Sequence, residues 1–184
     1  MRVVSGKYKG KRWDVPNTFK ARPTTDFAKE GLFNILHNVY TDFDSHPSAL
    51  DLFCGTGSIS IELLSRGCSP VVSVEKDFKH YQYLRRLASD LKDPAWHPIQ
   101  GDVAKFLSST HRTDSYDIIF ADPPYALEWL ADIPNMVFAD GRTTPLLREE
   151  GLFILEHGRN YDFSTHPHFI DHRCYGSVNF SFFR

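Results

Sequence analysis

The chain alternates between short apolar segments and amphipathic segments over most of its length, and this pattern limits the possible folds more than any other feature. We predict strands at residues 48–53, 70–75, 96–100, 116–121 and 151–157, and helices at 26–39, 58–66, 78–91, 103–109, 126–137 and 143–149. The last residues predict two further strands that meet at Tyr175-Gly176. Apolar strands without alternation are typical of parallel sheets buried on both faces. The pattern therefore predicts an α/β fold, with a Rossmann-like parallel sheet, helices on both faces and a reversed last strand.

Size and composition fit a single globular domain. The 184 residues are 41% hydrophobic and 24% charged, and no stretch approaches the roughly 18 apolar residues that a membrane-spanning helix needs. Cys54, Cys68 and Cys174 form no C-x-x-C pair, which favours free thiols in a reducing compartment. The first residues contain no apolar segment typical of a secretory signal. We expect a cytoplasmic protein without a membrane partner.

Positive charge is concentrated at the start of the chain. Residues 1–22 carry seven cations and one anion, a net charge of +6, although the whole chain has a net charge of −2. Turn residues at Ser5-Gly6 and Lys9-Gly10 predict a β-hairpin, so we expect a basic hairpin arm at 1–22 and a compact domain at 23–184. Such an arm is suited to a polyanion such as RNA, and a charged edge strand that resists aggregation is the alternative. The candidate RNA contacts are Arg2, Lys7, Lys9, Lys11, Arg12, Lys20 and Arg22.

A glycine-rich turn joins the first central strand to the next helix, as in nucleotide-binding folds. Gly55 and Gly57 in "DLFCGTGSIS" let a ligand approach the backbone, and Glu75 ends the next strand, where it could accept both hydroxyls of an adenosine ribose. Asp51 precedes Gly55 by four residues, where a carboxylate would repel a pyrophosphate but attract an ammonium or sulfonium group. S-adenosylmethionine carries both cations and no phosphate, so it is favoured over NAD. Asp102, after the third strand, is placed to accept a hydrogen bond from the adenine amine.

The strand at 116–121 ends in a stiff corner, Asp122-Pro123-Pro124-Tyr125. Neither proline can donate a hydrogen bond, so the sheet ladder stops there. The exocyclic amines of adenine and guanine are poor nucleophiles, because their lone pair is delocalised into the ring. Asp122 and the backbone carbonyl of Pro123 could each accept one amine hydrogen, which would aim the lone pair and stabilise charge that develops on nitrogen. Pro124 would stiffen the corner and Tyr125 would stack on an extruded base; a purely structural turn is the alternative.

Several segments together resemble one family of nucleic-acid methyltransferases. The motifs D-x-F-x-G-x-G and D-P-P-Y are typical of enzymes that methylate amino groups of bases. With "RVVSGKYKGK", "RPTTDFAKEGLFNIL", "VEKD" and "YGSVNFSFF", the chain resembles the RsmD-type 16S ribosomal RNA guanine-N2 methyltransferases from end to end. This resemblance implies a seven-stranded class I methyltransferase sheet, S-adenosylmethionine as cofactor, and N2-methylguanine in small-subunit RNA as product, made on a protein-bound assembly particle.

The resemblance also implies roles for individual residues. The cofactor would be held by Asp51, Phe53, Gly55, Gly57, Glu75, Asp102 and Val103. The target amine would be held by Asp122, Pro123, Pro124 and Tyr125, with Arg22, Thr24 and Thr25 at the entrance and the basic hairpin on RNA phosphates. No metal is expected, because His166, His168 and His172 fit a solvated surface better than a metal site. A monomer is expected, although the sequence does not determine the oligomeric state.

Two features depart from the family pattern and leave alternatives. Tyr125 is also usual in adenine-N6 enzymes, so an adenine-N6 methyltransferase of DNA or RNA is the second hypothesis. A non-catalytic RNA-binding or ribosome-assembly factor is the third, and an NAD oxidoreductase is a distant fourth. Gly31 stands where a better helix former is expected, at a cost of about 1 kcal/mol to the helix at 26–39.

Overall fold

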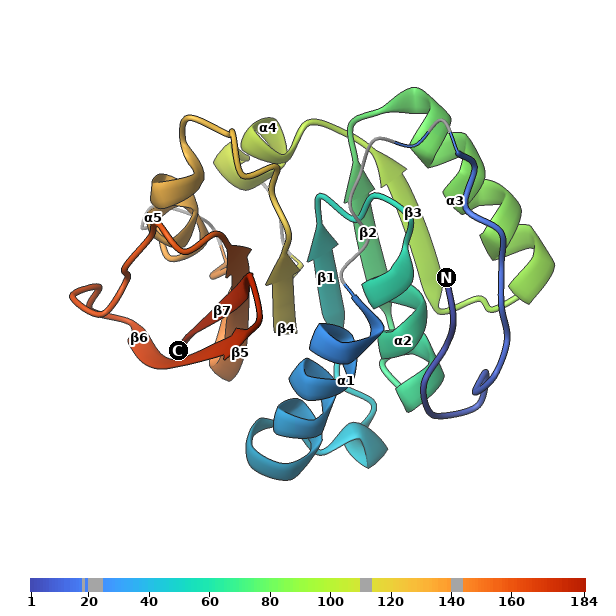
Figure 1. Cartoon of the computed structure of the whole chain (residues 1–184), viewed down its shortest axis with the longest axis horizontal. Helices are drawn as coiled ribbons and strands as arrows, with labels where there is room; N and C mark the ends of the chain where they lie inside the picture. Colours follow the sequence, from blue (N-terminus) through green and yellow to red (C-terminus); the bar gives the residue numbers. More distant parts are fainter. Residues whose placement is uncertain (18, 20–24, 110–113, 140–143) are drawn as a thin grey trace.

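A single mixed sheet forms the centre of the molecule. The computed structural model describes residues 1–17, 19, 25–109, 114–139 and 144–184. Seven strands follow the order β3-β2-β1-β4-β5-β7-β6 (Figure 1). Their bounds are β1 Ala49–Leu52, β2 Val71–Glu75, β3 Trp96–Gln100, β4 Tyr116–Ala121, β5 Leu147–His157, β6 Phe169–Tyr175 and β7 Val178–Phe183. The strands β1 to β5 pair in parallel and β7 pairs antiparallel with β5, so the predicted Rossmann-like sheet with a reversed last strand is confirmed.

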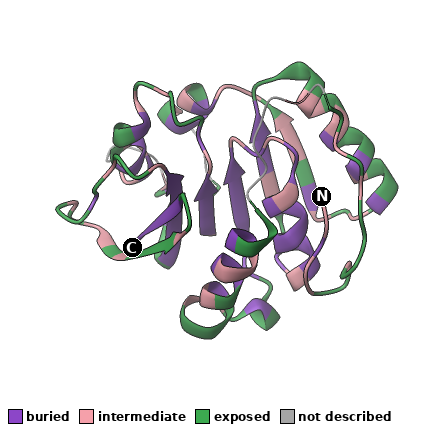
Figure 2. Cartoon of the chain, in the orientation of Figure 1, coloured by how far each residue is buried: buried purple, intermediate pink, exposed green. Residues whose placement is uncertain are grey.

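Helices cover both faces of this sheet. The helices α1 (Asp26–Ile35), α2 (Ser58–Arg66) and α3 (Phe78–Leu91) pack in one hydrophobic cluster, and α4 (Val103–Ser108) and α5 (Ile133–Val137) pack in the other. A π-helical turn at Leu36–Tyr40 extends α1, and short 3-10 turns lie at Phe43–Ser45 and Leu130–Asp132. The central strands are buried between these layers (Figure 2). Among the described residues, no helix is long and apolar enough to cross a membrane.

Strand alternation assigns the acidic residues of the central strands to one face. Ala49 of β1 packs with α1, α2 and α3, whereas Leu50 and Leu52 pack with α4 and α5. Asp51 therefore lies on the face that α1 to α3 cover, because side chains of one strand alternate between faces. The same alternation in β4, with Phe120 in the first cluster, places Asp122 on that face as well.

The predicted hairpin at the start of the chain is not confirmed. Residues 1–17 form one isolated antiparallel bridge, between Arg2 and Arg12, and no strand. Backbone hydrogen bonds still join the two arms of this segment, from Val3 to Lys11 at 3.0 Å and from Trp13 to Met1 at 3.1 Å, whereas the amides of Val4 and Ser5 donate to the Glu62 carboxylate at 2.8 and 3.0 Å. The segment is therefore closed by a few antiparallel backbone bonds and anchored on α2, without regular strands.

One helix prediction is wrong. Leu147, inside the helix predicted at 143–149, begins β5 and pairs with Tyr116 of β4. Leu146 and Leu147 are both buried in the cluster with α4 and α5. Burial against a neighbouring strand outweighs the helix preference of Leu, Arg and Glu, which is only a few tenths of a kcal/mol per residue. Residues 140–143 lie outside the described part of the chain.

Candidate active site

The turn after β1 has the backbone geometry of a ligand cradle. Phe53, Gly55 and Gly57 all have positive φ angles, of 60°, 52° and 74°. A side chain added at Gly57 would lie 2.6 Å from Leu84 of α3, so this glycine is required by packing. A side chain added at Gly55 would meet nothing closer than the Phe53 carbonyl at 3.8 Å. Gly55 therefore leaves open space at its backbone, which a ligand could use.

Asp51 is a buried carboxylate beside this turn. Its Oδ2 atom accepts a hydrogen bond from the Ser60 hydroxyl at 2.5 Å, and the Ser60 hydroxyl lies 2.6 Å from that of Ser73. Trp96 Nε1 completes the chain by donating to Ser73 at 2.8 Å. Oδ1 of Asp51 has no hydrogen-bond partner in the described part of the chain, and burial raises the pKa of Asp51 to about 7. A buried carboxyl group with an unpaired oxygen and a raised pKa is suited to bind a cationic ligand, so the site fits S-adenosylmethionine.

The two other predicted cofactor acids are anchored by backbone groups. Glu75, at the end of β2, accepts from the backbone amides of Gly55 at 2.8 Å and Asp77 at 2.7 Å. Asp102 caps α4 by accepting from the Lys105 amide at 3.1 Å, and its other oxygen lies 2.9 Å from Lys76 Nζ. The hydrogen bonds from Lys76 and Lys105 hold the pKa of Asp102 below its usual value. Asp102 thus has a structural role as a cap, and its contact with adenine stays a prediction.

Two apolar residues were also predicted at the cofactor. Val103 is buried at the start of α4, and the Phe53 ring lies 5.9 Å from the Trp129 ring. Both belong to the cluster on the α4 and α5 side of the sheet, Phe53 as a partly buried member. Their contact with the cofactor stays a prediction.

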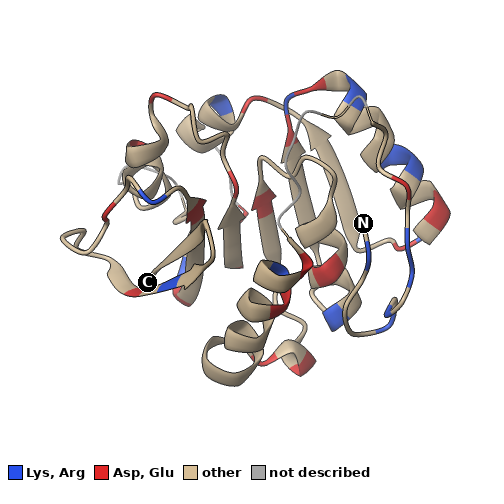
Figure 3. Cartoon of the chain, in the orientation of Figure 1, with Lys and Arg blue, Asp and Glu red and all other residues tan. Residues whose placement is uncertain are grey.

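The D-P-P-Y corner lies next to the glycine turn because β4 is the neighbour of β1. The backbone amide of Asp122 donates to the Leu52 carbonyl at 3.3 Å, which joins the two strand ends. Asp122 is partly buried and Pro123 is buried, whereas Pro124 and Tyr125 are exposed. The structure therefore brings the predicted amine-binding corner and the predicted cofactor turn together at the carboxyl ends of β1 and β4, which are neighbours in Figure 1. Acidic residues are coloured red along the same ribbon in Figure 3.

A third acid at this corner, Glu156 of β5, was missed by sequence reasoning. It is 4% exposed, and the Tyr125 hydroxyl lies 3.3 Å from its Oε1 atom. Burial and the nearby charges of Glu156 and Asp51 raise the pKa of Asp122 well above its ordinary value. The available signal was an acid directly after the apolar run 151–155, at the carboxyl end of a buried strand.

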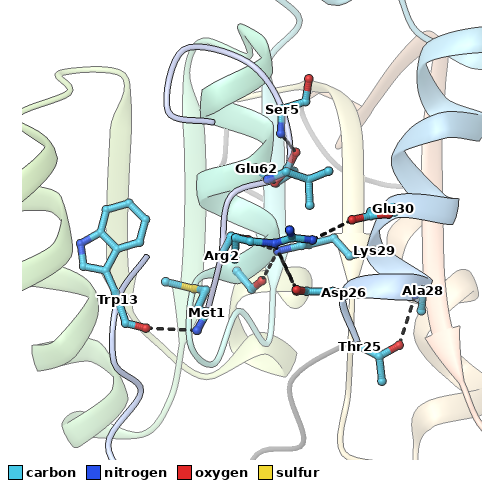
Figure 4. A network of polar contacts seen from close by, with 12 residues as sticks. Met1, Arg2, Ser5, Trp13, Thr25, Asp26, Ala28, Lys29, Glu30 and Glu62 are labelled. Atoms are coloured by element: carbon cyan, nitrogen blue, oxygen red, sulfur yellow. Dashed lines mark hydrogen bonds and ion pairs between the residues drawn. The ribbon is translucent and has the colours of Figure 1, made fainter. Parts of the chain in front are cut away.

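The predicted RNA-binding cations divide into two groups. Arg2 pairs with Glu30 at 2.9 Å and Asp26 at 3.3 Å, and Lys7 pairs with Asp93 at 2.7 Å. Figure 4 shows Arg2 held by these α1 acids, with Lys29 Nζ donating to its carbonyl oxygen at 2.6 Å. These two cations hold the arm on the body. Exposed positions are taken by Lys9, Lys11 and Arg12.

The remaining predicted contacts lie around residues 20–25. Lys20, Arg22 and Thr24 lie outside the described residues. Thr25 is the N-cap of α1, because its hydroxyl accepts from the Ala28 amide at 3.2 Å. This confirms the predicted start of the helix, whereas the place of Thr25 at the substrate entrance stays a prediction.

Comparison with known proteins gives one consistent family. The family model described as conserved hypothetical protein 95 matches residues 1–184. Ribosomal RNA small subunit methyltransferase D of Escherichia coli K12 is 30% identical over 156 residues, which cover 85% of this chain and 74% of that protein. The protein of the same name from Buchnera aphidicola subsp. Baizongia pistaciae is 35% identical over 125 residues, which cover 68% of this chain and 61% of that relative.

A solved structure agrees with this result over the whole chain. The yhhF protein of Escherichia coli is 26% identical, with a TM-score of 0.81, and the match covers 100% of this chain and 96% of that one. The fold thus agrees with that of a solved relative over the whole chain. The chain therefore belongs to the family of ribosomal RNA small subunit methyltransferase D, as an S-adenosylmethionine-dependent methyltransferase.

Proposed function

We propose that the protein methylates the N2 amine of a guanine in 16S ribosomal RNA. The observation that carries this proposal is the adjacency of the Asp122 corner to the glycine turn beside Asp51. An amine held at the corner would face a cofactor held at the turn. The resemblance to guanine-N2 enzymes and the names of the relatives support RNA of the small subunit as substrate.

Different residues of the site would bind the cofactor and the target base. Asp51, Gly55 and Glu75 would hold S-adenosylmethionine, which supplies an electrophilic methyl group on a positively charged sulfur. Asp122 and the carbonyl of Pro123 would accept the two amine hydrogens, so that the nitrogen lone pair points away from the corner. Asp122 would also take up the proton that the nitrogen loses. Tyr125, a residue that is 45% exposed, would stack on the base.

The protonation of Asp122 links these two halves of the site. Burial and the charges of Glu156 and Asp51 raise the pKa of Asp122, which favours the neutral form of its carboxyl group in the ligand-free protein. A cation bound beside Asp51 would lower that pKa, because opposite charges favour the ionised form. Asp122 would therefore be a stronger acceptor when the methyl donor is present.

The RNA would bind across the basic arm and the corner. Lys9, Lys11 and Arg12 would contact phosphates, and residues 22–25 would lie at the entrance of the base. We propose that the protein acts as a monomer in the cytoplasm. Its substrate would be a protein-bound small-subunit particle, because a partly assembled RNA structure would present one base to the enzyme.

A methyl-transfer assay tests the proposal. Purified protein is incubated with tritiated S-adenosylmethionine and either free 16S RNA or immature small subunits, and the RNA is digested to nucleosides. We expect the label in N2-methylguanosine. In Asp122→Ala, turnover should fall at least about 100-fold, because the variant lacks an acceptor that stabilises the transition state. Calorimetry should show that its affinity for the cofactor is nearly unchanged.

Other outcomes separate the alternatives. Label in N6-methyladenosine would contradict the proposal and support the adenine hypothesis. Cofactor binding without label in either RNA would support a non-catalytic RNA-binding factor. Full activity of Asp122→Ala would contradict the role of the corner.

A further inference from the structure

Glu156 lies beside Asp122 on the same face of the sheet. The register of β4 and β5 pairs Phe120 with Ile154 and Ala121 with Leu155, so the next position along both strands pairs Asp122 with Glu156. Partners in a parallel register point to the same face, and neighbouring strands are about 4.8 Å apart. Phe120 and Ile154 pack in the cluster with α1 to α3, which fixes that face. The corner thus presents two carboxyl groups side by side.

The Tyr125 hydroxyl ties Glu156 to the D-P-P-Y corner. It lies 3.3 Å from Oε1 of Glu156, and a side chain added at Gly158 would lie 3.5 Å from the Tyr125 ring. A carboxylate has about four lone-pair positions, so Glu156 can bind the tyrosine and a further donor at the same time. The aromatic ring proposed to stack on the base and the second acid therefore belong to one unit.

Two adjacent acceptors match one purine edge and not the other. Guanine presents two neighbouring donors, the N1–H and the N2 amine, whereas adenine presents the N6 amine beside an N1 lone pair. A carboxylate opposite the adenine N1 would face a lone pair and lose its hydrogen bond. Sites built to bind a donor reject analogues that lack it strongly, because the buried acceptor is left unpaired.

We propose that Glu156 accepts the N1–H of the target guanine while Asp122 accepts an N2 hydrogen, so that the two acids select guanine against adenine. This inference rests on the proposed guanine-N2 activity and names the residue that determines its base specificity. It explains how a corner ending in Tyr125, also common in adenine-N6 enzymes, can be specific for guanine.

A second role for Glu156 must be distinguished from this one. The carboxylate could act only through its bond to Tyr125, by holding the stacking ring in place. In that case Glu156 variants and Tyr125→Phe would lower the rate alike, without changing the preference between bases. Base preference is therefore the measurement that separates recognition from positioning.

The experiment replaces the target base in the RNA. After the methylated guanine has been mapped, small-subunit RNA carrying guanine, 2,6-diaminopurine or 2-aminopurine at that position is made by splinted ligation and assembled with small-subunit proteins. Both analogues keep the N2 amine and replace the N1–H by a lone pair, and 2-aminopurine also lacks a group at position 6. The kcat/KM values for N2 methylation are then compared.

Wild-type protein should prefer guanine to both analogues by at least about 100-fold. Glu156→Gln, which keeps the shape and can donate through its amide, should lower the value for guanine and raise it for the analogues, reducing the preference at least about 10-fold. Tyr125→Phe should lower all three values by similar factors and leave the preference within about 2-fold of wild type. Thermal unfolding of each variant checks that it is folded.

The two proposals fail in different ways. Methylation of native guanine together with equal methylation of both analogues would overturn the role of Glu156 and leave the proposed function standing. An unchanged preference in Glu156→Gln, or an equal loss of preference in Tyr125→Phe, would also overturn it. Absence of N2-methylguanosine with native RNA and wild-type protein would overturn the proposed function itself.

Discussion

At the scale of single residues, the site keeps a carboxylate where it costs stability. Asp51 is buried, and its pKa of about 7 lies some three units above the usual value of 3.8 because burial disfavours the charge. Between about pH 4 and 7 the folded protein binds a proton that the unfolded chain does not. The contribution of Asp51 to stability therefore falls as pH rises through this window, and above pH 7 it is unfavourable by up to about 4 kcal/mol.

Asp51→Asn should therefore stabilise the ligand-free protein at high pH. At pH 8 the variant should unfold at a higher temperature than wild type, because the amide keeps the contact with Ser60 and carries no charge. The difference should shrink towards pH 5, where Asp51 is protonated in the folded state. Thermal unfolding at a series of pH values measures this, and calorimetry should show weaker binding of S-adenosylmethionine to the variant.

The exposed Asp90→Asn on α3 is the matched control and should show no such pH-dependent gain. The gain in unfolding temperature of Asp51→Asn over wild type should be larger at pH 8 than at pH 5. A smaller gain at pH 8 would contradict the assignment of a buried charge.

At the scale of elements, close packing against β6 explains why α1 contains Gly31, an unfavourable helix residue. Gly31 lies against Tyr175 at the end of β6, and a side chain there would be 2.2 Å from Cε1 of the Tyr175 ring. That ring also meets Phe27 of α1 edge-on, with centroids 5.8 Å apart. Glycine makes the helix about 1 kcal/mol less stable than alanine would, but it lets α1 and β6 pack closely.

Gly31→Ala should consequently destabilise the protein although alanine is the better helix former. Overpacking costs typically about 1–3 kcal/mol, so we expect a net loss of about 1 kcal/mol in urea unfolding. In the Tyr175→Ala background the same change should become stabilising, because the obstructing ring is gone.

Asn34→Ala, at an exposed position of the same helix, provides the comparison and should be neutral or slightly stabilising. A gain in stability for Gly31→Ala in the wild-type background would show that the ring moves aside freely.

At the scale of the whole molecule, charge is divided between an acidic body and a basic arm. Two of the arm's cations, Arg2 and Lys7, are used in ion pairs with the body. Lys9 and Lys11 are exposed, and Lys11 lies 5.0 Å from the centre of the Tyr8 ring. Ion pairs with the body thus distinguish Arg2 and Lys7 from Lys9 and Lys11, although the Lys7 side chain is itself 49% exposed.

We expect Lys9→Gln with Lys11→Gln to weaken RNA binding and reduce its salt dependence. If each lysine neutralises one phosphate, the slope of log K against log salt should fall by about 1.4 for single-stranded RNA. Fluorescence anisotropy with a labelled small-subunit RNA fragment at several KCl concentrations gives this slope.

Lys7→Gln serves as the control, because it removes a cation of the same arm that is already bound to Asp93. It should leave the slope unchanged and lower the unfolding temperature slightly. Equal slopes for the double variant and wild type would show that the arm does not contact phosphates.

The sequence alone determined the order of strands and helices from α1 to β4, the parallel sheet and the place of the two motifs. Apolar runs without alternation, the glycine turn at Gly55 and Gly57, and the prolines after β4 are local signals, and local backbone preference decides them. The terminal reversal was also visible, because Tyr175-Gly176 is a turn signal between two strands.

Only the tertiary structure decided how distant groups meet. Glu62 of α2 anchors the first residues through the amides of Val4 and Ser5, and the segment at 147 is a strand because β4 lies beside it. The register of β4 and β5 places Glu156 at the site, and an ion pair with α1 holds Arg2 on the body. Burial, register and charge pairing depend on residues far apart in the chain, so a local pattern such as the acid after residues 151–155 marks a candidate residue but not the groups it contacts.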